Sequence, residues 1–298
     1  MITTYFTGNL GNGLIQYNLI REIAHRANLE FGFTKRYFFD YYGGKLQSDF
    51  LNLDYGYPVD INYGETKNFY MWREKKISNY VNGDYYDYHP FQNDVFENPK
   101  DNTIYVFSCG QDARYFDINH LKEWNQIKKE NVENYNKVLE YHKINLEDEN
   151  LCVINVRGGE YVYIPNLILD VDYWKKSIEI MIDKNPKVYF AVVTDDVDYA
   201  RQILPKMNVY HFTIGLDYYI INHAKNLILS NSSFAIIPSV TNPNNPFIIA
   251  PKYWARYNVS NGYWASSDIW TFSKWGFNFM NREGKLFSYS ENGEEKIL

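Results

Sequence analysis

The sequence has little cysteine and no long apolar run. Its two cysteines, Cys109 and Cys152, cannot form the disulfide framework of a small secreted domain, and both lie in apolar, strand-like segments. This favours buried thiols in a reducing compartment. No stretch approaches the roughly 18 consecutive apolar residues of a membrane-spanning helix, and the first residues lack the pattern of a signal peptide. The sequence therefore predicts a cytoplasmic protein with no membrane span.

Basic residues, glycine and proline are also scarce. The chain has 30 lysines and arginines against 36 aspartates and glutamates, a formal net charge of −6. This balance argues against a nucleic-acid binder, because such proteins need a basic surface. The 17 glycines and 10 prolines exclude a collagen-like or low-complexity chain. With roughly 150 residues per domain as a prior, the length of 298 residues predicts two domains.

Metal-ligand and phosphate-loop patterns are missing as well. The six histidines include no pair at the spacing of zinc ligands, so no zinc site is expected. The sequence contains neither a P-loop nor the G-x-S-x-G segment of a hydrolase. What it has in excess is tyrosine, with 29 residues, concentrated between residues 37 and 88.

The chain opens with the pattern of an α/β unit. Residues 2–6 favour a strand, residues 8–13 (G-N-L-G-N-G) a glycine turn, and residues 14–28 a helix. Closely spaced glycines let the backbone approach a phosphate or a sugar, although a tight turn without a ligand fits this spacing equally well. The spacing differs from the dinucleotide fingerprint G-x-G-x-x-G. Residues 34–95 indicate loops and short strands.

An acidic segment at residues 146–150 predicts the boundary between the domains, which gives domains 1–148 and 149–298. From residue 151 onward, buried strands alternate with helices. The strands are expected at 151–156, 188–193, 209–212 and 226–230, and the helices at 173–183, 197–204 and 216–224. This alternation predicts a doubly wound, mainly parallel sheet.

Three polar motifs follow these predicted strands, where open α/β sheets bind their ligands. The first, N-V-R-G-G-E-Y at residues 155–161, places Arg157 beside two glycines, a combination suited to a phosphate. The second is Asp195-Asp196, whose carboxylates suit a ribose or a guanine. The third, N-S-S-F at residues 231–234, either cradles a phosphate or simply caps a helix.

The order of these motifs resembles the α-1,2-fucosyltransferases of glycosyltransferase family 11. The family's opening G-x-L-G-N-Q-x-F-Q-Y is similar to residues 8–17, and its H-x-R-R-G-D-Y to residues 155–161. Its D-D, N-S-S-F and A-P-x-x-W segments are similar to residues 195–196, 231–234 and 250–254. Residues 111–116 and 169–178 look like two further family segments.

The resemblance implies a GT-B fold, in which two Rossmann-like domains face a central cleft. It implies an inverting, metal-independent and cofactor-independent transfer of fucose from GDP-fucose to an oligosaccharide acceptor, in an α-1,2 linkage to galactose or a similar sugar. The C-terminal domain would bind the donor and the N-terminal domain the acceptor. Arg157 would be catalytic through the β-phosphate, and Glu160 is the candidate base. The other implied donor-binding residues are Gly11, Asn12, Asn155, Asp195, Asp196, Ser232 and Ser233.

Several departures from the family pattern leave alternatives open. Asn155 stands where the family has histidine, Gly158 where it has a second arginine, Glu160 where it has aspartate and Gly13 where it has glutamine. A glycosyltransferase with another nucleotide-sugar donor is therefore one alternative. A non-catalytic carbohydrate-binding protein that stacks sugars on its tyrosines is another. A third is a metal-dependent transferase that uses the D-x-D triplet at 196–198.

Overall fold

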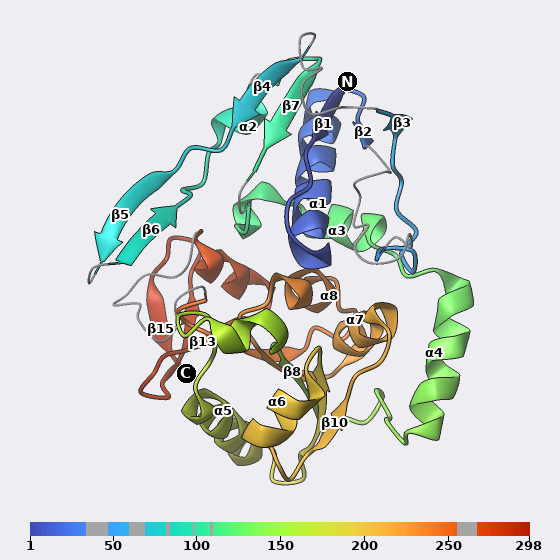
Figure 1. Cartoon of the computed structure of the whole chain (residues 1–298), viewed down its shortest axis with the longest axis vertical. Helices are drawn as coiled ribbons and strands as arrows, with labels where there is room; N and C mark the ends of the chain where they lie inside the picture. Colours follow the sequence, from blue (N-terminus) through green and yellow to red (C-terminus); the bar gives the residue numbers. More distant parts are fainter. Residues whose placement is uncertain (34–46, 60–68, 82–83, 98, 108–109, 255–266) are drawn as a thin grey trace. The chain divides into compact units, whose positions relative to one another are not determined.

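The computed structural model describes residues 1–33, 47–59, 69–81, 84–97, 99–107, 110–254 and 267–298 (Figure 1). These residues form two compact units. Unit 1 comprises Met1–Gln126 together with Ser266–Asp268, and unit 2 comprises Ile127–Ala265 and Ile269–Leu298. Cys109 and parts of the tyrosine-rich segment lie outside the described residues.

The division between the units lies at residues 126/127 and not at 148, where the acidic segment predicted it. Helix α4 (Lys129–Tyr141) belongs to unit 2 because it packs on helix α7 (Ile214–His223). The Tyr219 hydroxyl donates a 3.1 Å hydrogen bond to the Asn136 side chain. The acidic segment is likewise held by unit 2, since Asp148 accepts a hydrogen bond from the Tyr189 hydroxyl at 3.0 Å.

Unit 1 is built on a small parallel sheet. Its strand order is β1 (Ile2–Thr4), β7 (Thr103–Val106) and β4 (Tyr70–Arg73), and both pairings are parallel. Helix α1 (Leu10–Ala27) follows β1 and buries most of its length. The remaining elements are two small pairs of strands and short helices: β2 (Gly32–Phe33) with β3 (Tyr57–Pro58), β5 (Ile77–Val81) with β6 (Asp84–Tyr88), α2 (Asp94–Glu97), η3 (Ala113–Tyr115) and α3 (Ile118–Trp124).

Helix α1 begins four residues earlier than the sequence predicted. Only Gly8 lies in the turn after β1, with φ at +78°. Gly11 and Gly13 are buried residues of the helix itself, so the expected glycine turn at 8–13 is wrong from Leu10 onward. Glycine has a low helix propensity, but burial of this end of the helix outweighs that preference.

Unit 2 contains a sheet of eight strands in the order β10-β9-β8-β11-β12-β13-β14-β15. The first six strands are parallel to their neighbours, and the last two pairings are antiparallel. The strands are β8 (Leu151–Val156), β9 (Tyr189–Thr194), β10 (Asn208–Tyr210), β11 (Asn226–Leu229), β12 (Phe247–Pro251), β13 (Phe277–Met280), β14 (Leu286–Tyr289) and β15 (Glu295–Ile297). The α/β fold class and the doubly wound sheet are thus confirmed.

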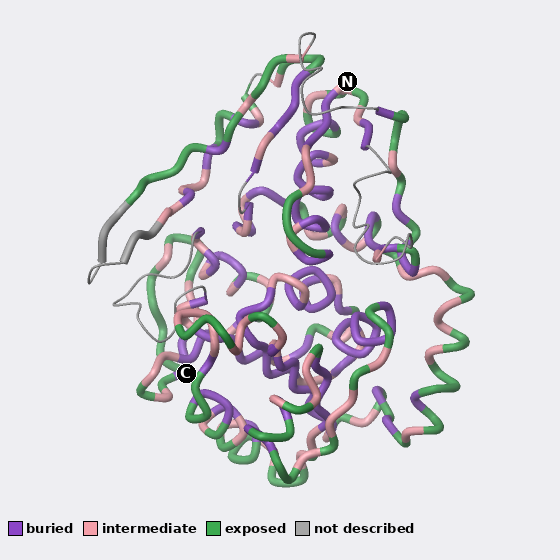
Figure 2. Tube along the Cα trace, viewed as in Figure 1, coloured by how far each residue is buried: buried purple, intermediate pink, exposed green. Residues whose placement is uncertain are grey.

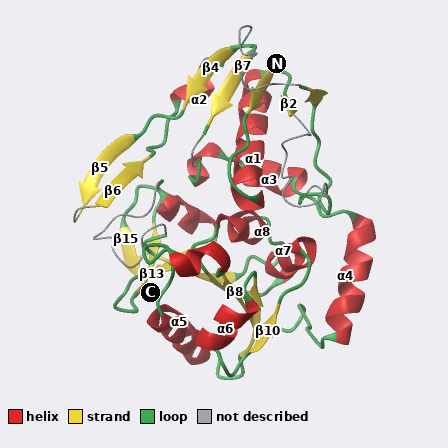
Figure 3. Ribbon diagram, in the orientation of Figure 1, coloured by secondary structure: helices red, strands yellow, loops and turns green. Residues whose placement is uncertain are grey.

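Helices cover both faces of this sheet (Figure 3). Helices α5 (Val171–Lys184) and α6 (Val197–Ile203) pack against Cys152, Ile154 and Val156 on one face. Helix α7 lies against the other face with η5 (Ser233–Ala235) and α8 (Ile236–Val240). Every residue of β8 is buried as a result, and the strand runs through the purple interior of Figure 2. The shorter helices η4 (Gly159–Tyr163) and η6 (Ile269–Trp275) complete the unit.

Candidate functional site

The parallel part of the unit 2 sheet has a topological switch point between β8 and β11. Numbered along the chain, its six parallel strands follow the order 3-2-1-4-5-6, so the chain leaves the two central strands toward opposite faces. Ligands of doubly wound sheets bind outside the carboxyl ends of the strands at such a point. The three polar motifs of the sequence follow β8, β9 and β11, and the structure brings their residues to this edge.

Arg157 is the central side chain of this edge. It follows β8 directly, keeps 20% of its side chain exposed, and forms ion pairs with the carboxylates of Asp195 and Glu160. Its guanidinium carbon lies 5.1 Å from the centre of the Tyr161 ring. The two carboxylates therefore hold the two terminal nitrogens of the guanidinium. They orient a fixed positive charge at the switch point.

The two aspartates after β9 hold the glycine loop. Asp195 accepts a hydrogen bond from the Gly158 amide at 2.8 Å, and Asp196 accepts one from the Gly159 amide at 3.1 Å. Asp196 also caps α6 by accepting from the Tyr199 amide at 3.0 Å. In this structure both carboxylates therefore bind their own chain. Their predicted contact with a ribose or a guanine stays a prediction.

Gly158 is packed against Asp196. A Cβ atom added at residue 158 would lie 2.4 Å from the Cβ of Asp196 and 3.0 Å from its Cγ. A side chain at residue 158, where the family pattern has a second arginine, would therefore overlap with Asp196. This contact gives a physical reason for the glycine at residue 158.

Asn155 and the two serines lie at the same edge. The Asn155 side chain is buried and accepts a 3.2 Å hydrogen bond from the Ser230 hydroxyl, which joins the ends of β8 and β11. Ser232 is buried and precedes η5, and Ser233 is the first residue of η5. The sequence placed these residues correctly at the strand ends. Their contact with a donor stays a prediction.

The remaining predicted donor residues, Gly11 and Asn12, belong to unit 1. The Asn12 side chain accepts a 3.2 Å hydrogen bond from the Gln111 side chain, and it packs against Gly8. These residues follow β1 and β7 at the carboxyl edge of the unit 1 sheet. Gly11 is buried within α1. The sequence grouped Asn12 with Arg157, and the structure places the two in different units.

The D-x-D triplet at 196–198 lies at the start of α6, with Asp196 as its cap and Asp198 in its first turn. Among the described residues, no group of three histidine, cysteine, aspartate or glutamate side chains is arranged to hold a metal ion. Likewise, none of the described helices has the length and hydropathy that a membrane crossing requires.

The sequence reasoning missed Asp217, in the first turn of α7. Its side chain is 10% exposed and lies 3.6 Å from Nδ1 of His211. Burial, with a smaller contribution from the charge of Asp195, raises the pKa of Asp217 to about 8. From sequence alone, an acid in the first turn of a helix is read as a favourable partner of the helix dipole. Its burial depends on contacts that no local pattern indicates.

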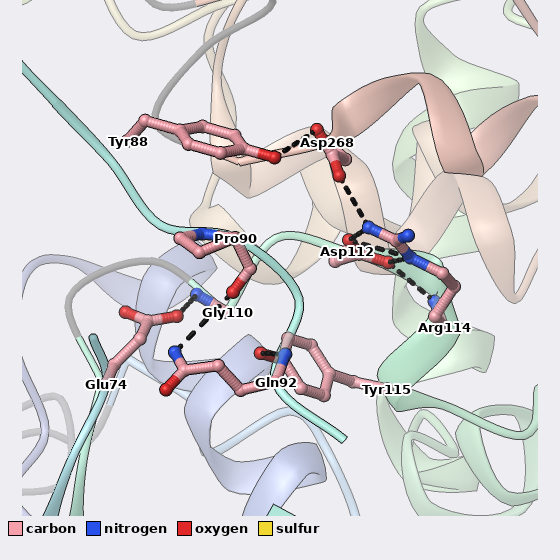
Figure 4. A network of polar contacts seen from close by, with 9 residues as sticks. All are labelled: Glu74, Tyr88, Pro90, Gln92, Gly110, Asp112, Arg114, Tyr115 and Asp268. Carbon is pink, nitrogen blue, oxygen red and sulfur yellow. Dashed lines mark hydrogen bonds and ion pairs between the residues drawn. The ribbon is translucent and has the colours of Figure 1, made fainter. Parts of the chain in front are cut away.

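The sequence also missed a polar network in unit 1 (Figure 4). Arg114 contacts Asp112 and Asp268, each at 2.5 Å, and the Tyr88 hydroxyl donates a 2.8 Å hydrogen bond to Asp268. Burial raises the pKa of Asp112. Asp268 reaches this network from a segment more than 150 residues away in the chain, which no sequence spacing reveals.

A family model described as Glycosyl transferase family 11 matches residues 58–267. The chain belongs to glycosyl transferase family 11. The resemblance read from the ordered motifs is thereby confirmed. Among curated proteins, the O-antigen biosynthesis glycosyltransferase WbnK of Escherichia coli is 23% identical over 172 residues. The match covers 53% of this family 11 chain and 57% of the length of that relative.

Solved structures similar to this family 11 chain include a fucosyltransferase and a complex with GDP. The fucosyltransferase NodZ from Bradyrhizobium is 12% identical, with a TM-score of 0.49, and the similarity covers 82% of this chain and 96% of NodZ. POFUT1 in complex with GDP is 10% identical, with a TM-score of 0.48, and the similarity covers 84% of this chain and 97% of POFUT1.

Proposed function

We propose that this family 11 protein is an inverting glycosyltransferase that transfers fucose from GDP-fucose to a hydroxyl group of an oligosaccharide acceptor. The observation that carries the proposal is the position of Arg157. A fixed cation stands beside a glycine loop at the switch point of a doubly wound sheet, which suits the diphosphate of a nucleotide sugar. The motifs shared with α-1,2-fucosyltransferases support fucose as the sugar, and the relative's role in O-antigen biosynthesis supports a glycan acceptor.

The proposed chemistry is a single displacement at the anomeric carbon. The acceptor oxygen attacks this carbon from the face opposite the nucleotide, while the bond to the β-phosphate breaks and its electron pair leaves with GDP. Arg157 stabilises the negative charge that develops on the diphosphate. To do so, Arg157 exchanges one of its two carboxylate partners for a phosphate oxygen. Glu160 is the partner that is exchanged, because 58% of its side chain is exposed against 31% for Asp195.

Neither a metal nor a cofactor is needed for this reaction, because the charge of the leaving group is met by a protein cation. We propose Asn12, Asn155, Asp195, Asp196, Ser232 and Ser233 as further donor contacts. Glu160 stays a candidate base. Its carboxylate forms an ion pair with Arg157. Activity that disappears in a chelator and returns with Mn²⁺ would support the metal-dependent alternative.

Thermal unfolding with GDP, UDP and CDP tests the donor. A ligand at 100 times its dissociation constant stabilises the native state by about 2.7 kcal/mol. Of the three nucleotides, only GDP should therefore raise the melting temperature by several degrees. Arg157→Ala should abolish this shift and sugar transfer, whereas Arg201→Ala, an exposed arginine of α6, should change neither. Stabilisation by UDP or CDP alone would indicate another donor. Binding of oligosaccharides without any nucleotide would indicate a non-catalytic protein.

A further inference from the structure

Unit 1 contains a buried pair formed by a carboxylate and an imidazole that the proposed chemistry does not yet use. Nδ1 of His89 lies 3.1 Å from Oε2 of Glu74, and their side chains are 5% and 2% exposed. The distance is that of a hydrogen bond, although the two groups lack the alignment of one. Catalytic hydrogen bonds are often poorly aligned before the substrate binds. Burying an ionisable pair costs free energy of folding, and apolar residues of similar size could fill the same space. Such pairs are therefore candidates for a functional role.

This pair lies at the edge of the sheet where a ligand is expected. Glu74 is the residue that follows β4, and its amide extends the β4–β7 ladder by donating to the Val106 carbonyl at 3.0 Å. Its Oε1 accepts a 3.2 Å hydrogen bond from the amide of Gly110, in the loop after β7. The next residue, Gln111, contacts Asn12. A continuous chain of contacts therefore links Glu74 with the proposed donor contact Asn12 along the carboxyl edge of the unit 1 sheet.

The loop that carries His89 is fixed relative to Glu74. Gln92 accepts a 3.1 Å hydrogen bond from the amide of Lys75, the residue after Glu74. The Gln92 amide donates to the Tyr115 hydroxyl at 3.0 Å, as Figure 4 shows. In the same loop, the Phe91 ring packs 4.8 Å from the Tyr115 ring. Such fixed support keeps an imidazole within the narrow range of positions that proton transfer requires.

We propose that His89, in place of Glu160, is the base that deprotonates the acceptor hydroxyl, and that Glu74 is a positioning residue for it. This inference rests on the proposed glycosyl transfer. Nδ1 of His89 faces the Glu74 carboxylate. With the ring proton on Nδ1, the electron pair of Nε2 is the one that can accept a proton. As the acceptor oxygen bonds to the anomeric carbon, its proton moves to Nε2 and the electron pair of the breaking bond leaves on GDP. The imidazolium then returns the proton to water.

The test compares His89→Ala and Glu74→Gln with a matched pair in the same unit. His120 and Glu22 form a similar contact, with Nδ1 of His120 2.9 Å from Oε1 of Glu22, but they join α3 to α1. Transfer is measured with GDP-fucose and lactose, and with GDP-fucose alone, in which water is the acceptor. GDP affinity is measured by calorimetry on every variant, and thermal unfolding reports folding.

We expect His89→Ala to lower kcat by about 10²–10⁴-fold. GDP affinity should stay within about twofold of that of the original protein. Added imidazole should restore part of this activity, because it replaces the missing base, and it should restore nothing in Glu74→Gln or His120→Ala. Glu74→Gln should lower kcat by about tenfold without changing the KM for GDP-fucose, since it misorients the imidazole only. His120→Ala and Glu22→Gln should leave kcat unchanged.

A folded His89→Ala protein with unchanged kcat, or with a loss that imidazole does not reverse, would overturn the inference. If His89→Ala does not fold, His89→Gln keeps a donor for Glu74 but has no base, so it should show the same loss of kcat. The original protein failing to bind GDP would instead refute the proposed function. The two failures are therefore distinguished by the calorimetry.

Discussion

Gly158→Ala tests whether the glycine loop after β8 is locked to the cap of α6. The new methyl group would lie 2.4 Å from the Cβ of Asp196 and 3.0 Å from Oδ2. The clash involves the first carbon of a side chain whose carboxylate is held by the amides of Gly159 and Tyr199. The main chain on one side of the contact must therefore move, and the hydrogen bond from Gly159 is the contact most directly stretched.

The cost follows from two contributions. Overpacking of a close contact costs about 1–3 kcal/mol, and loss of one hydrogen bond adds about 1 kcal/mol. The substitution should therefore lower the free energy of unfolding by about 2–4 kcal/mol. For a unit of this size, this corresponds to a fall in melting temperature of about 4–16 °C. Since the displaced amides flank Arg157, the shift of melting temperature caused by GDP should shrink as well.

Calorimetric unfolding of a double-mutant cycle with Asp196→Gly provides the control. Glycine costs little at a helix cap and removes the Cβ that clashes. The double variant should therefore be more stable than the sum of the two single changes predicts, by at least about 1 kcal/mol. Additive effects, or a Gly158→Ala protein as stable as the original, would refute the packing argument.

Three further outcomes are expected. Asp217→Asn should flatten the pH dependence of stability. Folding raises the pKa of Asp217 from 3.8 to about 8, so the folded state holds the proton more tightly than the unfolded state. The free energy of unfolding of the original protein should therefore fall between about pH 4 and 8, by at most about 1.4 kcal/mol per pH unit. Denaturant unfolding at pH 5 and 8 measures this slope. Tyr173→Phe should cost about 1–2 kcal/mol, because the buried hydroxyl donates to the Leu229 carbonyl at 2.6 Å; an unchanged midpoint would contradict that contribution. Cys152 should not react with a thiol reagent in the native protein, because burial raises its pKa, and modification before unfolding would contradict its buried position.

The C-terminal half of the chain was predictable because its signals are local. Residues 151–156 form one apolar run, and a strand covered on both faces has that pattern wherever it occurs. The motifs after these strands were placed correctly for the same reason, since parallel strands end at a common edge. The start of α1 was not predictable, because burial of Leu10, Gly11 and Gly13 by distant residues outweighs the local preference of glycine.

The division between the units was misjudged for a related reason. An acidic, polar segment indicates exposure, but exposure alone does not mark a boundary. Lys225 lies 3.4 Å from Glu147 and 3.7 Å from Glu149, so the segment is attached to unit 2 by charges supplied from much later in the chain. The preceding helix α4 packs on α7 in the same way.

The sequence by itself determined the family, the alternation of strands and helices in unit 2, and the choice of Arg157 as the central cation, because each depends on residue types at fixed spacing. Only the tertiary structure decided what surrounds these residues. It showed that Asp195 and Glu160 neutralise Arg157 and that Asp196 fills the space beside Gly158. It also brought Glu74 to His89 and Asp268 to Arg114. Contacts between residues far apart in the chain depend on the folded path of the backbone, which local spacing does not encode.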